Sequence, residues 1–225
     1  MKTIADKIPR KNAKKFKRAQ EIKAIFLKEF DNPKTELIYS NAFELLCAVM
    51  LSAQCTDKRV NIVTPALFAK YPSPKEMSKA KLEDVKELIK SVSFFNTKSQ
   101  NLIKTATIIC EKYGGIVPEN ALDLQSLPGV GQKTANVVLI ELRGANLMAV
   151  DTHVFRTSHR LGLSDAKTAL ETEKDLALLF QTDLSALHQA MVLFGRYLCK
   201  AQKPQCEICY LEKYCKYKGA SFKPK

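Results

Sequence analysis

The sequence of 225 residues contains no tryptophan and only eight glycines. It also lacks sustained alternation of apolar and polar residues, the pattern expected of half-buried strands. The N-terminal residues include no apolar segment of the signal-peptide kind, and no apolar run is long enough to span a bilayer. We therefore expect a soluble, cytoplasmic, all-α protein with no membrane partner.

Acidic residues are in the minority, since 23 Asp and Glu stand against 36 Lys and Arg, and the formal net charge is +13. Most of the excess positive charge lies at the two ends of the sequence. Residues 1–18 hold eight basic residues and one acidic residue, and residues 199–225 hold seven lysines and two glutamates. Such clustering favours a polyanionic partner, although a pair of solvated basic tails would have the same composition.

Residues 127–135 form the most informative segment and read LPGVGQKTA. Pro128 presets a turn, and Gly129 and Gly131 permit positive φ. The backbone N–H groups of Gly129, Val130 and Gly131 can then point outward together and bind an anion beside a helix N-terminus. The segment predicts a phosphate-binding turn that opens a buried helix. A simple glycine turn between two core helices is the structural alternative.

Lys133 falls in the first turn of this helix. The positive end of the helix dipole disfavours a cation there and favours the neutral amine, which is the nucleophilic form. Farther along the chain, residues 150–156 read VDTHVFR, and Asp151 is placed to cap the next helix. A solvated lysine and a purely structural cap are the alternatives for Lys133 and Asp151.

Together, these two motifs resemble the helix-hairpin-helix DNA glycosylase superfamily and, within it, the endonuclease III family. The resemblance implies a base-excision-repair enzyme that removes oxidised pyrimidines and also has AP lyase activity. Lys133 would be the nucleophile and Asp151 the essential carboxylate, acting as a base or as a stabiliser of positive charge on the sugar. The implied partner is double-stranded DNA with damaged bases or abasic sites, bound at the nucleoid by a monomer.

The chemistry favours this function over two alternatives. After the damaged nucleotide is rotated out of the duplex, Lys133 can form an imine with the sugar, and β-elimination then cleaves the strand. A monofunctional glycosylase for mismatched adenine or thymine would not need that lysine. A non-enzymatic iron–sulfur DNA-binding module would not need Asp151.

Rotation of a nucleotide leaves a gap that an inserted side chain usually fills. Gln54 and Phe94 stand at positions resembling the two wedge loops of the family, although the family often has an aliphatic residue in place of Phe94. Core packing is the alternative for the aromatic side chain.

Four of the seven cysteines fall within 17 residues, in the pattern C-x6-C-x2-C-x5-C. They are Cys199, Cys206, Cys209 and Cys215. Structural zinc sites usually pair two C-x2-C knuckles, and the spacing also differs from that of ferredoxins. The pattern alone therefore leaves the metal open. The resemblance implies a [4Fe–4S] cluster in a loop that presents Lys200 and Lys203 to phosphates.

The family resemblance also implies two helical lobes with a cleft between them, faced by the glycine turn and Asp151. A six-helix lobe with the helix-hairpin-helix motif would span residues 35–145. Residues 1–34 and 146–225 would form the second lobe, which carries the cluster. Residues 1–14 are expected to be disordered or weakly helical, and Asp57 is expected to cap a helix. The other helix expectations are about 15–30, 43–51, 57–70, 81–92, 97–113, 119–126, 132–142, 151–160, 168–180 and 183–198, with a short helix after Ser73.

Overall fold

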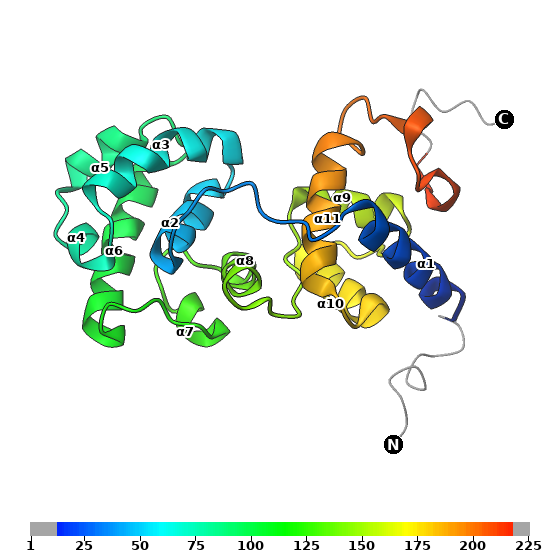
Figure 1. Cartoon of the computed structure of the whole chain (residues 1–225), viewed down its shortest axis with the longest axis horizontal. Helices are drawn as coiled ribbons and strands as arrows, with labels where there is room; N and C mark the ends of the chain where they lie inside the picture. The colour runs from blue at the N-terminus through cyan, green and yellow to red at the C-terminus, as the bar shows by residue number, and fades with distance from the viewer. Residues whose placement is uncertain (1–12, 218–225) are drawn as a thin grey trace, which may run out of the picture. The chain divides into compact units, whose positions relative to one another are not determined.

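The computed structural model describes residues 13–217, and Figure 1 shows their course. Within that range the chain forms eleven α-helices and two short 3-10 helices, with no strand. The all-α expectation is confirmed. None of the described helices combines the length and the apolar character needed to cross a membrane. The expectations for residues 1–12 and for the lysines beyond residue 217 lie outside the described range.

The chain divides into two compact units, and one of them is continuous in sequence, Thr35–Ala145. In this unit α6 packs against α4 and α5, while α2 packs against α3, α6 and α8 (Figure 1). Nearly every residue of α2 is buried, as its apolar sequence predicts. The helices of this unit are α2 (Ala42–Ser52), α3 (Asp57–Lys70), α4 (Pro74–Ser78), α5 (Leu82–Ile89), α6 (Phe95–Tyr113), α7 (Ala121–Gln125) and α8 (Gln132–Arg143).

The other unit combines the described parts of residues 1–34 and 146–225. Its core includes Phe26 and Phe194, whose rings meet edge-to-face with centroids 5.4 Å apart. Helices α9 and α11 pack closely because Gly195 has no side chain. A Cβ at that position would lie 2.8 Å from the Cβ of His153. The elements of this unit are α1 (Ala13–Glu29), α9 (Thr152–Arg160), α10 (Ala169–Phe180), α11 (Leu184–Tyr197) and the 3-10 helices Cys206–Ile208 and Glu212–Tyr214.

Side-chain caps fix several helix starts. Asn41 caps α2 by accepting from the Glu44 N–H, and Ser73 caps α4. The expectation that Asp57 caps α3 is wrong. The cap is Thr56, whose Oγ1 accepts from the N–H of Arg59 at 3.2 Å, while Asp57 is the first helical residue. A carboxylate there still lies at the favourable positive end of the helix dipole.

Candidate active site and metal centre

The glycine turn is fixed to the rest of its unit by hydrogen bonds and packing. The hydroxyl of Thr105, on α6, donates to the carbonyl of Pro128 at 3.0 Å. Leu127 is only 2% exposed and anchors the start of the turn in the core. Gly129 has a φ of +79°, and a Cβ there would lie 2.7 Å from the amide nitrogen of Asn101. The turn therefore needs glycine at position 129 for both its backbone conformation and its close packing.

Two details of the turn differ from the expected nest of three outward N–H groups. The N–H of Val130 donates to the carbonyl of Leu127 at 3.1 Å, and its side chain is buried. Val130 therefore stabilises the turn. Gly131 is the N-cap of α8 and has extended backbone with φ −88°, so it does not use the positive φ that glycine permits. No atom lies within 4 Å of a Cβ built on Gly131. This space would let a ligand approach the backbone closely.

Lys133 lies in the first turn of α8, as the sequence predicts. Its side chain is exposed, whereas all residues from Thr134 to Ile140 are buried. Helix α8 thus anchors the lysine backbone through a buried segment and leaves the amine on the surface. This is the arrangement that an amine needs to reach a bulky substrate.

Asp151 is the N-cap of α9, as expected. Its Oδ1 accepts from the N–H of Val154 at 2.8 Å, and the residue is half-buried. Val150 and Val154 on either side are buried, which fixes the backbone that carries the carboxylate. Asp151 belongs to the unit with two chain segments, whereas Lys133 belongs to Thr35–Ala145.

Arg156 is a residue that the sequence reasoning missed. Its guanidinium donates to the carbonyl of Gly195 at 2.7 Å and to that of Cys199 at 3.1 Å, and it lies 3.3 Å from Nδ1 of His153. Burial lowers the pKa of Arg156, and the charge of Asp151 acts in the opposite direction. The arginine therefore ties the helix that Asp151 caps to the start of the cysteine loop. The sequence signal that could have pointed to Arg156 is its position at the end of the VDTHVFR motif.

The two candidate wedge residues share an unusual backbone conformation. Gln54 has a φ of +53° and Phe94 a φ of +58°, a region that residues with side chains rarely adopt. Both side chains are exposed, Phe94 to 63%, whereas the neighbouring Phe95 is half-buried. The exposed ring of Phe94 is therefore available to a ligand, and Phe95 contributes to packing.

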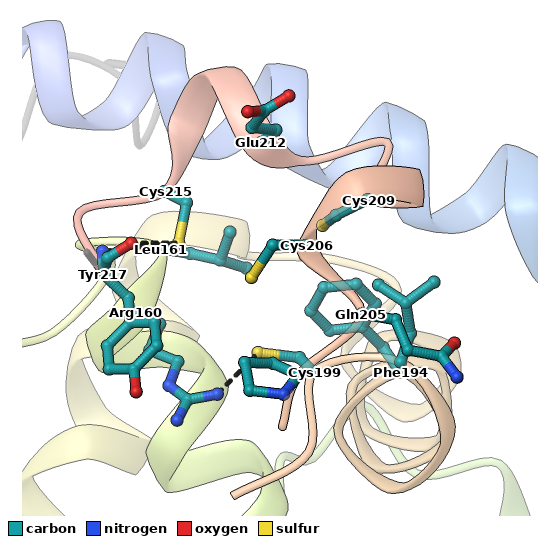
Figure 2. Close-up of a pocket in the computed structure, with 12 residues that line it drawn as sticks. Arg160, Leu161, Phe194, Cys199, Gln205, Cys206, Cys209, Glu212, Cys215 and Tyr217 are labelled. Atoms are coloured by element: carbon teal, nitrogen blue, oxygen red, sulfur yellow. Dashed lines mark hydrogen bonds between the residues drawn. The ribbon is translucent and has the colours of Figure 1, made fainter. Parts of the chain in front are cut away.

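The four clustered cysteines line one pocket between α9, the end of α11 and the C-terminal loop (Figure 2). The remaining lining includes apolar side chains from Leu161, Phe194 and Leu198. Among residues 13–217, no three His, Cys, Asp or Glu side chains are grouped to hold a single metal ion. The four cysteines nevertheless converge on the same space.

The electrostatics of the pocket favour a bound cationic group. Burial, together with the charges of the other three cysteines, raises the pKa of Cys209 to about 11. Burial also raises the pKa of Cys215. The Arg160 guanidinium donates to Sγ of Cys199 at 3.3 Å, and the backbone N–H of Tyr217 donates to Sγ of Cys215 at 3.4 Å (Figure 2). Four thiols, one buried and three half-buried, with donors aimed at two of the sulfurs fit a thiolate-ligated metal group.

The cysteine loop is also held by contacts that do not involve the thiols. Leu211 is fully buried in the core, and Tyr214 is 8% exposed. The Tyr214 hydroxyl donates to Glu21 on α1, and Arg18 donates to the carbonyl of Tyr214. These contacts hold the loop on its unit.

Lys200 and Lys203 are exposed on this loop. The carbonyl of Lys200 accepts from Arg160 at 2.8 Å, and Lys203 has a φ of +48°. Their backbone is thus part of the fixed loop, while their ammonium groups face solvent.

Comparison with known proteins identifies the family. Residues 47–182 match the family described as HhH-GPD superfamily base excision DNA repair protein. Endonuclease III of Rickettsia conorii is 48% identical over 194 residues, which cover 86% of this chain and 92% of that protein. The chain belongs to the endonuclease III family.

Other endonuclease III proteins agree with this assignment. The Escherichia coli protein is 43% identical over 83% of this chain and 89% of its own length. A solved structure described as a non-covalent endonuclease III–DNA complex is 43% identical, with a TM-score of 0.84 over 88% of this chain and 95% of that one. As a member of the endonuclease III family, the chain is a base excision repair enzyme that acts on DNA, a glycosylase with AP lyase activity.

Proposed function

We propose that this enzyme removes oxidised pyrimidines from double-stranded DNA and cleaves the strand at the resulting abasic site, with Lys133 as the nucleophile. The observation that supports this role best is the exposed amine of Lys133 in the first turn of a buried helix, directly after a glycine turn with open space at Gly131. A similar structure is described as a trapped endonuclease III–DNA covalent intermediate. A covalent intermediate of this kind requires a nucleophile on the protein.

In the proposed reaction the neutral amine of Lys133 attacks C1′ of the flipped nucleotide, and the base departs with the electrons of the glycosidic bond. Opening of the sugar ring gives an imine between Lys133 and C1′. Removal of a proton from C2′ then expels the 3′ phosphate with the electrons of its C–O bond. Water hydrolyses the imine and returns the amine. Asp151 acts as the base for the lysine or stabilises the positive charge on the sugar.

The DNA is held by the backbone and by exposed basic groups. Gly129 and Gly131 allow close approach of a phosphate to the turn, and Lys200 and Lys203 contribute charge from the cysteine loop. Gln54 or Phe94 fills the gap left by the flipped nucleotide. The partner in this proposal is a duplex that carries a damaged base or an abasic site. The protein acts as a monomer in the cytoplasm, associated with the nucleoid.

We further propose that Cys199, Cys206, Cys209 and Cys215 hold a [4Fe–4S] cluster. The shared pocket and the donors aimed at two of the sulfurs support this proposal. When bound, the cluster supplies four metal–thiolate bonds that cross-link the loop, and its chemistry is not needed for base removal. Iron and sulfide in the purified protein would support the proposal, whereas a colourless protein with zinc would overturn it.

A trapping experiment tests the catalytic assignment. A duplex with one oxidised thymine is incubated with the enzyme and borohydride, which reduces an imine to a stable adduct. We expect an adduct with the native chain and with Lys104→Gln, an exposed control on α6, but none with Lys133→Gln. Asp151→Asn should bind the duplex and lose most of the activity. An unchanged adduct yield in Lys133→Gln would remove Lys133 as the nucleophile.

The same experiment addresses the two alternative functions. A monofunctional mismatch glycosylase would release a mismatched base without forming any adduct. A non-enzymatic module would bind the duplex, release no base and leave the strand intact.

A further inference from the structure

The left-handed backbone of Gln54 and Phe94 requires a local cause. Such a conformation costs free energy in a residue with a side chain, and it persists only when the surroundings fix it. Both side chains are exposed, so their own packing does not provide that restraint. Hydrogen bonds to the neighbouring backbone can supply such a restraint.

Lys98 supplies such bonds at the first of these loops. Its Nζ donates to the carbonyl of Leu51 at 2.8 Å and to that of Ala53 at 2.6 Å, and the residue is 8% exposed. These carbonyls lie at the C-terminal end of α2, where intrahelical donors run out and the helix dipole favours a cation. The Ala53 carbonyl belongs to the peptide that precedes Gln54. A bond to that oxygen therefore fixes the peptide plane between Ala53 and Gln54 and limits rotation about the φ of Gln54.

The same residue also bonds the second loop. The backbone N–H of Lys98 donates to the carbonyl of Phe94 at 3.0 Å in the first turn of α6. Lys98 thus contacts the Gln54 loop through its side chain and the Phe94 loop through its backbone. Burial lowers the pKa of Lys98, with the nearby Cys55 thiol acting in the opposite direction. A desolvated cation of this kind depends on well-placed acceptors.

We propose that Lys98 is a positioning residue that holds the Gln54 and Phe94 loops in one fixed arrangement, so that both side chains meet the DNA together. The proposal rests on the wedge roles proposed above for Gln54 and Phe94. It assigns no contact between Lys98 and the DNA. The lysine acts by preorganising two loops that are about forty residues apart in sequence.

Lys98→Met tests this role because it keeps an unbranched apolar stem and removes the ammonium. Lys104→Met is the matched control, since Lys104 lies on the same helix and is exposed. Lys98→Met removes the two hydrogen bonds of Nζ, so both loops should open more readily. We expect hydrogen exchange of the backbone amides at positions 55 and 98 to accelerate by about tenfold or more, a factor typical for the loss of one charge-assisted hydrogen bond. Single-turnover base excision should slow by a similar factor, with unchanged affinity for undamaged duplex. The control should alter none of these quantities.

Two further variants separate failure of this proposal from failure of the proposed wedge roles. If Gln54→Ala and Phe94→Ala both excise at the native rate, those wedge roles are wrong whatever Lys98 does. If they slow excision while Lys98→Met does not, the role of Lys98 is overturned. Native-state hydrogen exchange of the unmodified chain covers the case in which Lys98→Met does not fold. The protected amides of Cys55 and Lys98 should have the same free energy of opening, since one event exposes both. Different opening free energies would refute the coupling.

Discussion

Alanine substitution at the two glycines of the turn separates their roles in stability and in DNA binding. Gly131 has ordinary extended backbone and open space around a Cβ, whereas Gly129 has a φ of +79° and lies against Asn101. Gly131→Ala should therefore change stability by no more than about 1 kcal/mol, because the lower entropy of the unfolded chain is offset by the poorer capping of α8 by alanine. Gly129→Ala should cost roughly 1–2 kcal/mol from the left-handed backbone alone, with a further cost from displacing Asn101.

For DNA binding, Gly131→Ala should have a large effect although its effect on stability is small. A methyl group at position 131 would keep a phosphate away from the backbone N–H and remove a charge-assisted hydrogen bond, which is worth about 1.5–3 kcal/mol. That loss corresponds to roughly a 10- to 150-fold increase in Kd. Gly131→Ala thus predicts a stable protein with weak binding, a combination that general destabilisation cannot produce.

The assay is fluorescence anisotropy with a duplex that contains a stable abasic-site analogue. All variants are compared at one ionic strength because binding to phosphates depends steeply on salt. Thermal unfolding of the same preparations gives their stabilities. An unchanged Kd in Gly131→Ala would refute the close approach of a phosphate at this turn, even if the chain remained an active enzyme.

Three further outcomes follow from contacts outside the turn. Lys203→Gln should weaken binding equally for all sequences and reduce the slope of log Kd against log salt by about one, as measured by a salt titration. Cys206→Ser should lower both the iron content and the thermal midpoint, and retention of a full complement of iron would contradict its assignment as a ligand. The bond from Lys23 holds the pKa of Asp183 below its usual 3.8. Asp183→Asn should therefore cost at most about 1 kcal/mol near neutral pH. The difference in stability between the native chain and Asp183→Asn should shrink as acid protonates Asp183 in the native chain. A constant difference down to pH 2 would contradict this account.

The sequence predicts local structure well where one residue type has one dominant effect. Gly114 ends α6 in the left-handed conformation, as a glycine after a helical segment indicates. Asp151 caps α9, and the apolar run of α2 is buried. In each case the cause lies within a few residues of its effect, so no knowledge of tertiary contacts is needed.

The errors and omissions arise where several residues could do the same task or where distant contacts decide the outcome. Thr56 and Asp57 are both good caps, and the sequence does not fix which of them adopts extended backbone. The left-handed conformations of Gln54 and Phe94 carry no sequence signal because neither is glycine. The contact of Arg156 with the carbonyl of Cys199 joins residues 43 positions apart, and only the folded chain reveals it.

One face of α6 links these separate observations in the continuous unit. Lys98 bonds the end of α2, Asn101 lies against Gly129, and Thr105 bonds the carbonyl of Pro128. The spacing of these three side chains, three and then four residues apart, places them on the same side of a helix. A single rigid element therefore sets both the loop that carries Gln54 and the turn that precedes Lys133. Substitutions along this face should alter base excision more than they alter the affinity for undamaged DNA, because they move the groups proposed to catalyse and to insert without removing any charge that faces phosphate.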